Sequence, residues 1–91
     1  MKIADILPEK EIKDAVLGEY EKRLVLYKLT DEQLKKKYKM DFKDFEEKSI
    51  VKKKGFSWDV EQDAMHWDHA VEGIRYIEKK IKQIKAIDAK N

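Results

Sequence analysis

A seven-residue repeat of apolar side chains runs through the last third of the chain and restricts the fold more than any other feature. The repeat has one set of positions spaced seven apart and a second set three or four residues beyond them: Val60, Trp67, Ile74 and Ile81, then Ala64, Ala70, Ile77 and Ile84. Such a repeat is typical of a coiled-coil helix, whose apolar seam lies against another helix. We therefore expect one helix over residues 58–89, about 48 Å long at 1.5 Å per residue, with Ser57 as its N-cap.

The remainder of the chain also favours helices. It contains one proline and three glycines, and it lacks the alternating β-branched runs that indicate strands. The predicted fold is all-α, a single helical domain covering the whole sequence. Pro8 marks the start of a first helix that we expect to end near Lys28. Thr30 is predicted to cap a second, shorter helix, and Asp41 to cap a third helix that ends near Val51.

These boundaries predict a long helical hairpin, with two short helices between the long N- and C-terminal helices. Residues 52–55 form a linker in which Gly55 can adopt the left-handed conformation. A first helix of about 20 residues is shorter than its partner by about a third, so part of the isoleucine row would stay in water. We therefore predict a homodimer or an obligate hetero-complex. The predicted dimer seam on the C-terminal helix consists of Ile74, Ile77, Ile81 and Ile84.

Charge is abundant, balanced and segregated along the chain. Charged residues make up 44% of the sequence, with 21 basic residues against 19 acidic ones and a net charge of +2. Residues 55–74 contain five acids and no lysine or arginine, whereas residues 75–91 contain six basic residues and two acids. This gradient agrees with the dipole of the C-terminal helix, and it would favour an antiparallel encounter with an identical helix.

The stretch FSWDVEQDAMHWDHAVEG, residues 56–73, combines aromatic and acidic side chains on one predicted helix. Trp67 falls on the heptad seam and is interpreted as a core residue, while Phe56 and Trp58 are expected to pack beneath the third predicted helix. Alternatively, all three aromatic residues anchor a partner protein, because aromatic residues dominate interface hot spots. The partner-binding residues are then predicted to be Phe56, Trp58, Trp67, Asp59, Asp63 and Asp68.

Metal binding and catalysis receive little support from the sequence. Two acids and two histidines share a broad face of the C-terminal helix: Asp59, Asp63, His66 and His69. A single helix cannot surround a metal ion, so His66 and His69 are interpreted as surface or partner-contact residues, with a metal site as the weaker alternative. The chain has no cysteine, no glycine-rich phosphate loop and no spare serine nucleophile, from which we expect no enzymatic activity and no cofactor.

Two lysine clusters suggest a second function, nucleic-acid binding. They flank the third predicted helix and consist of Lys35, Lys36, Lys37, Lys52, Lys53 and Lys54. Lysines can bind phosphates, but without a base-reading motif the contact would be non-specific, and protein binding is the preferred interpretation. No segment approaches the roughly 18 apolar residues of a membrane span, and the N-terminus does not resemble a signal peptide. We therefore expect a soluble, cytoplasmic protein, and its abundant lysine, glutamate and isoleucine favour a thermophilic source.

Two segments, KKYKMDFKDFEEK and GFSWDVEQDAMHWDHAVEGIRYIEKKI, carry a likeness to known proteins. The residues that carry it are Tyr38, Met40, Phe42, Phe45, Phe56, Ser57, Trp58, Glu61, Asp63 and Trp67. Over about residues 35–80 the chain resembles a group of small archaeal and bacterial helical proteins, members of which often look like antitoxins encoded beside small toxins. Lys39 departs from the pattern by standing where a turn glycine is expected. The resemblance implies an interaction protein whose acidic side meets a basic toxin surface.

Overall fold

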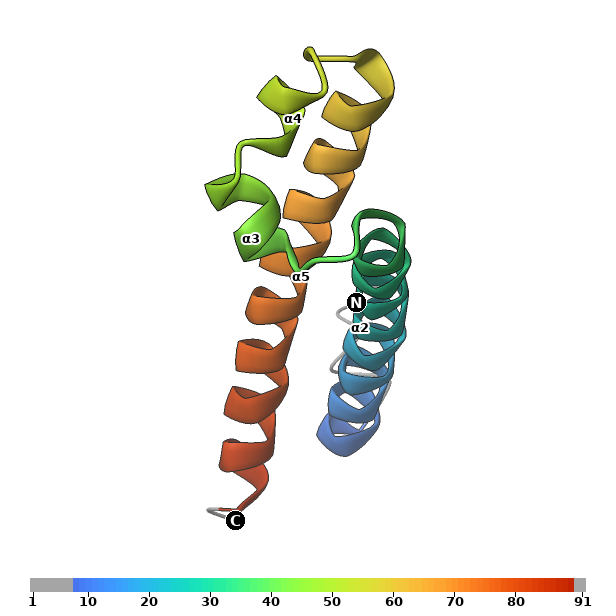
Figure 1. Ribbon diagram of the computed structural model, residues 1–91. Helices are drawn as coiled ribbons and strands as arrows, with labels where there is room; N and C mark the ends of the chain where they lie inside the picture. Colours follow the sequence, from blue (N-terminus) through green and yellow to red (C-terminus); the bar gives the residue numbers. More distant parts are fainter. Residues whose placement is uncertain (1–7, 90–91) are drawn as a thin grey trace.

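The structure, a computed structural model, describes residues 8–89, which form four helices and, within that range, no strand. Two long helices, α2 (Glu9–Tyr38) and α5 (Trp58–Ala89), lie side by side as an antiparallel hairpin (Figure 1). Two short helices, α3 (Phe42–Glu47) and α4 (Ile50–Lys53), connect them and lie along the first half of α5. The predicted all-α hairpin, with two short helices between the long ones, is confirmed.

The first long helix extends well beyond its predicted end. α2 continues from Lys28 to Tyr38, so the predicted break and the separate helix capped by Thr30 are wrong. Thr30 lies inside α2, where its hydroxyl donates to the carbonyl of Leu26 at 3.3 Å. Residues 31–38 are mostly good helix formers without glycine or proline, so nothing in them forces an interruption. As a result α2 and α5 have nearly equal lengths, 30 and 32 residues.

The longer α2 covers the isoleucine row of α5. Ile77 is only 2% exposed, and the other three members of the row are half-buried in the single chain: Ile74, Ile81 and Ile84. Near the open end of the hairpin, Ile12 and Val16 of α2 line a hollow together with Ile84. Because α2 is longer than predicted, it shelters more of this row than expected, but Ile74, Ile81 and Ile84 remain partly exposed to water.

Left-handed residues set the path from α2 to α4. Lys39, with φ 57° and ψ 38°, ends α2 in the conformation usually taken by glycine. Asp41 caps α3 as predicted, since its carboxylate accepts a hydrogen bond from the backbone N–H of Asp44 at 2.9 Å. Ser49, with φ 50°, then separates α3 from α4. The single helix predicted from Asp41 to Val51 is therefore wrong, because the left-handed Ser49 divides it in two.

The end of α4 forms a Schellman motif that leads into α5. The N–H of Phe56 donates to the carbonyl of Val51 at 2.9 Å, and the N–H of Gly55 donates to that of Lys52 at 3.0 Å. Gly55 has a φ of 69°, which confirms its predicted left-handed conformation. Phe56 also has a positive φ, 55°. Because α4 continues to Lys53, the linker is shorter than the predicted residues 52–55.

The core lies where three helices meet. It is formed by Leu34 of α2, Phe45 of α3 and Trp67 of α5, and the partly buried residues around it include Tyr38, Met40 and Phe42. The ring centroids of Phe45 and Phe42 lie 5.0 and 5.3 Å from that of Trp67. Rings at such distances pack favourably in tilted arrangements. This aromatic cluster fixes α3 against the hairpin, and it thereby positions α4 and the start of α5.

Candidate functional site

Trp67, one of the predicted partner anchors, lies in the centre of the core. Its side chain is 0% exposed, and its indole N–H donates to Oδ1 of Asp31 at 2.8 Å. Oδ2 of Asp31 in turn lies 3.3 Å from Nζ of Lys35, and the hydrogen bond with Asp31 raises the pKa of Lys35. The interpretation of Trp67 as a core residue is confirmed. Its alternative role as a surface anchor is wrong, because the chain itself occupies every side of the ring.

Asp63, another predicted partner residue, is engaged within the chain. Its Oδ2 accepts hydrogen bonds from Nζ of Lys37 at 2.6 Å and from the hydroxyl of Tyr38 at 2.5 Å. Burial disfavours the charged carboxylate, yet these two hydrogen bonds outweigh it and hold the pKa of Asp63 below its usual value. Burial and the hydrogen bond with Asp63 raise the pKa of Tyr38. Asp63 therefore joins α5 to the end of α2 and is not free for a partner.

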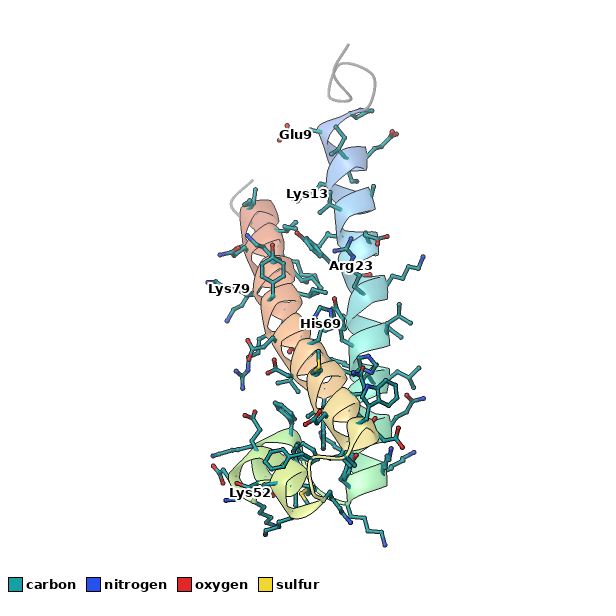
Figure 2. All side chains as sticks on the ribbon, turned by 90° about the horizontal axis from the view of Figure 1, so that it is seen from above. Glu9, Lys13, Arg23, Lys52, His69 and Lys79 are labelled. Atoms are coloured by element: carbon teal, nitrogen blue, oxygen red, sulfur yellow. The ribbon has the colours of Figure 1, made fainter. Side chains whose placement is uncertain are left out.

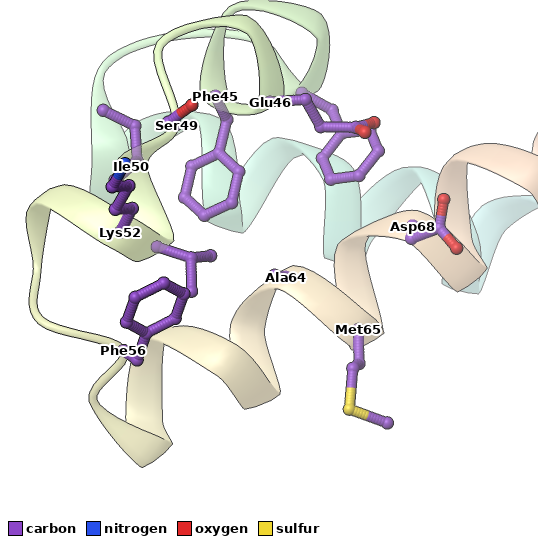
Figure 3. Close-up of a pocket in the computed structure, with 11 residues that line it drawn as sticks. Phe45, Glu46, Ser49, Ile50, Lys52, Phe56, Ala64, Met65 and Asp68 are labelled. Atoms are coloured by element: carbon purple, nitrogen blue, oxygen red, sulfur yellow. The ribbon is translucent and has the colours of Figure 1, made fainter.

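An open groove of about 630 Å³ lies between α3, α4 and the first turns of α5 (Figure 3). Most of its lining is apolar and consists of Phe42, Phe45, Ile50, Val51, Phe56, Ala64 and Met65. The polar residues that line it are Glu46, Ser49, Lys52 and Asp68. Figure 3 shows the ring of Phe45 pointing from α3 toward α5 at Ala64, and Phe56 lying at the turn between α4 and α5. The groove is thus an apolar surface at the closed end of the hairpin.

Three large apolar side chains at this end of the molecule face water. Phe56 is 60% exposed, Trp58 is 71% exposed and Met65 is 64% exposed. The expectation that Phe56 and Trp58 pack beneath the third predicted helix is therefore wrong. Met65 was not among the residues singled out from the sequence. Its position on the side of α5 opposite the heptad seam was the available signal, because such a residue has no facing helix in the hairpin.

Acidic side chains are exposed on the first turns of α5, and one of them lines the groove. Asp59 and Asp68 are exposed, and so is Glu61 between them. Asp68 also lines the groove, together with Glu46 of α3. Of the three acids predicted to contact a partner, the structure thus leaves two accessible and places them beside the exposed aromatic residues. The combination of apolar surface and negative charge suits a partner with the opposite charge.

The two histidines lie at the edge of α5 that borders α2. Both are exposed, and Nε2 of His69 lies 3.4 Å from the hydroxyl of Tyr27. The rings of Tyr27 and His69 meet edge to face at a centroid distance of 5.4 Å, and Figure 2 shows His69 beside α2. Within residues 8–89, no group of three or more histidine, cysteine or acidic residues is placed to hold a metal ion.

The lysine clusters differ in how far they are already neutralised. Lys35 forms ion pairs with Asp31 at 3.3 Å and with Glu32 at 3.6 Å, and Lys37 pairs with Asp63. The remaining members of the two clusters are exposed: Lys36, Lys52, Lys53 and Lys54. The first cluster therefore offers less positive charge to a phosphate backbone than its sequence suggests, while the second lies on α4 and the turn that follows it.

No protein-family model, curated protein or solved structure matches the chain. In the part of the chain that the structure describes, no helix combines the length and the apolar character needed to cross a membrane. The function is therefore inferred from the groove, its exposed aromatic residues and its acidic border.

Proposed function

We propose that the protein is a protein-binding module whose groove accepts an apolar segment of a basic partner protein. The observation that supports this most directly is the exposure of Phe56, Trp58 and Met65 beside an apolar groove. Large apolar side chains gathered at one place on a soluble surface are typical of interaction sites. Tryptophan and other aromatic residues are also enriched among the residues that contribute most to binding energy.

The backbone conformation of Phe56 supports a role beyond folding. Its φ of 55° lies in the left-handed region, which costs a residue with a side chain roughly 1–2 kcal/mol relative to the right-handed conformation. Glycine would adopt this backbone conformation without that energetic cost. The ring recovers little through burial in the chain, because it is 60% exposed. A bulky residue at a strained, exposed position is best explained by a contact outside the chain.

The acidic border of the groove defines the chemistry of the partner. Asp68 of α5 and Glu46 of α3 line the groove, and Glu61 is exposed on the same side of α5 two turns before Asp68. A basic amphipathic segment would place its apolar side against Phe56 and its positive side chains against these acids, which increases both association rate and selectivity. The resemblance to antitoxins implies one particular partner of this kind, a small toxin with a nucleic-acid-binding surface.

Binding can be tested with a basic amphipathic peptide in which leucine and lysine alternate at helical spacing, and with the product of any toxin-like gene beside this one. We expect Phe56→Ala and Trp58→Ala each to weaken peptide binding by about tenfold or more, as measured by isothermal titration calorimetry. Leu29→Ala is the matched control, because Leu29 is similarly exposed, at 53%, but lies on α2. Equal affinities for all four proteins would contradict the proposal.

A nucleic-acid-binding role for the lysine clusters is the alternative, and it predicts a different pattern. Binding to plain duplex or single-stranded DNA would weaken steeply with added salt. It would also be lost when Lys52, Lys53 and Lys54 are replaced by glutamine, and it would be unaffected by Trp58→Ala. A gel shift with these variants separates the two functions.

A further inference from the structure

The large apolar residues exposed on α5 lie along one line opposite the heptad seam. This line passes the edge of the groove at Met65 and the edge of the hollow beside α2 at Ile87. They are Trp58, Met65, Tyr76 and Ile87, with exposures of 71%, 64%, 55% and 57%. Successive members are 7, 11 and 11 residues apart. At roughly 100° per residue, all four therefore fall within about 40° of one another around the helix axis. In Figure 3 the side chain of Met65 points away from α3, which shows the direction of this line.

This line has an internal symmetry centred on Tyr76. Met65 and Ile87 each lie eleven residues from Tyr76, on opposite sides of it. Glu72 and Lys80 each lie four residues from it, one on either side. A two-fold axis passing beside Tyr76 would therefore set Met65 against the second copy's Ile87, and Glu72 against the second copy's Lys80. We call these five residues the outward stripe.

The charges that flank the outward stripe favour the same antiparallel arrangement. The exposed residues on its flank change from acidic to basic along the helix: Glu61, Asp68, Arg75, Lys79 and Lys82. Antiparallel pairing brings the acidic half of each helix beside the basic half of the other, whereas parallel pairing sets like charges together. The eleven-residue spacing corresponds to about 3.67 residues per turn, so two nearly straight helices can stay in contact over six turns or so.

We propose that two copies of the chain pair in antiparallel orientation through the outward stripe, with Tyr76 at the two-fold axis. The interface is isologous, since each apolar and charged position meets its complement in the second copy. The isoleucine row takes no part in it, because α2 already covers that row. Met65 and Asp68 belong both to this interface and to the groove, whereas Phe56 and Trp58 lie beyond the paired segment and stay accessible. The self-association is argued from the outward stripe and does not rest on the proposed function of the groove.

Sedimentation equilibrium of the whole chain over a concentration series tests the pairing. We expect a reversible dimer, and we expect Tyr76→Glu to raise its dissociation constant at least tenfold, because the two-fold axis places two introduced carboxylates face to face. Val25→Glu is the matched control, since Val25 is 66% exposed on α2 and should leave the dimer unchanged. A wild-type chain that stays monomeric up to about 1 mM would overturn the proposal. So would equal weakening by both variants.

Cross-linking tests the orientation, and the absence of cysteine from the chain makes single introduced thiols unambiguous. We expect an oxidised mixture of the Met65→Cys and Ile87→Cys variants to form the mixed disulfide much faster than either variant forms a disulfide with itself. A parallel dimer would reverse this order and overturn the proposal. Helical circular dichroism verifies that each variant is folded.

The same variants distinguish the dimer proposal from the groove proposal. Tyr76→Glu should retain peptide binding in the groove, and Trp58→Ala should retain the dimer, so that the failure of one proposal is distinguishable from the failure of the other.

Discussion

The two tryptophans of the chain lie nine residues apart on one helix and have opposite environments. Trp67 is 0% exposed, whereas Trp58 is 71% exposed. The indole N–H of Trp67 donates to Asp31, and its ring is in contact with those of α3. The burial of an aromatic side chain is among the largest single contributions to a small core. Trp67 therefore serves the fold, while Trp58 is left available for a contact outside the chain.

The polar groups show the same division. Around Trp67, Asp31 accepts a hydrogen bond from the indole and Asp63 accepts one from the hydroxyl of Tyr38. Within the described residues, no buried side-chain nitrogen or oxygen lacks a hydrogen-bond partner. Around Trp58, by contrast, Asp59 and other acids are exposed. Substitutions near Trp67 should therefore change stability, and substitutions near Trp58 should change binding.

Trp67→Ala is the strongest test of this comparison. Removing a fully buried tryptophan should lower the free energy of unfolding by about 3–5 kcal/mol, because it leaves a cavity among the core rings. It also leaves the carboxylate of Asp31 without its indole donor. Urea denaturation followed by circular dichroism measures the loss. Trp58→Ala is the matched substitution, and we expect it to change stability by less than about 0.5 kcal/mol, as is usual for exposed positions. A similar loss for both variants would contradict the assignment.

The carboxylate of Asp63 should produce a second, smaller and pH-dependent effect. At neutral pH we expect Asp63→Asn to lower the free energy of unfolding by about 1.5–3 kcal/mol, the usual contribution of hydrogen bonds to a charged group. The folded state lowers the pKa of Asp63, so its contribution is complete above the usual carboxyl value of 3.8 and is lost as pH falls through the folded-state pKa.

The stability difference between the wild type and Asp63→Asn should therefore narrow as the solution is acidified below about pH 4. Chemical denaturation at a series of pH values measures this difference directly. Tyr38→Phe provides the control, because it removes one of the two hydrogen bonds and keeps the ring in the core. It should show a smaller loss at neutral pH. A difference that stays constant from neutral to acidic pH would show that the carboxylate is not the titrating group.

A pair of glycines tests how closely the two long helices approach each other. A Cβ atom built on Gly73 would lie 2.5 Å from a ring carbon of Tyr27, whereas nothing lies within 4 Å of one built on Gly18. Gly18→Ala should stabilise the protein by about 1 kcal/mol, because alanine is the better helix former. Gly73→Ala should destabilise it, since overpacking costs about 1–3 kcal/mol and exceeds that gain. Thermal unfolding of the two variants should shift in opposite directions, and a shift in the same direction would contradict the close contact.

The sequence predicted the hairpin because its signals are local and repeated. The heptad repeat defined α5, the side chain of Asp41 capped α3, and Gly55 took its left-handed conformation. The length of α2 was not predictable in the same way. A capping pattern that starts at Thr30 consists of residues that are equally acceptable inside a helix. The contacts of Asp31 with Trp67 and of Tyr38 with Asp63 hold this segment against α5, and they join residues far apart in the sequence.

The candidate site was predicted only in part, for a related reason. The sequence identified the aromatic and acidic character of residues 56–68, but the type of a residue does not fix its burial. The sequence does not show that Asp63 is bonded within the chain while Asp59 and Asp68 are exposed. That difference arises from the antiparallel register of α2 and α5, which brings Lys37 beside Asp63. Met65 and Tyr76 were not predicted, because the heptad repeat defines only the apolar seam of the helix and they lie on its opposite face.

A comparison of two substitutions at Phe56, with a small expected difference in stability, best separates the fold from the site. Phe56 has a φ of 55°, so Phe56→Gly relieves the left-handed strain, whereas Phe56→Ala removes the ring and keeps the strain. The glycine variant should therefore be more stable than the alanine variant by about 1 kcal/mol, the reverse of their order inside a helix. Both variants should lose peptide binding equally, because both lack the ring.

Two outcomes would contradict this account: an alanine variant more stable than the glycine variant, or a glycine variant that binds the peptide as tightly as the wild type. In either case Phe56 is retained for a reason other than binding. Measured together, denaturation and calorimetry on these two proteins separate the conformational role of the turn from the role of its side chain.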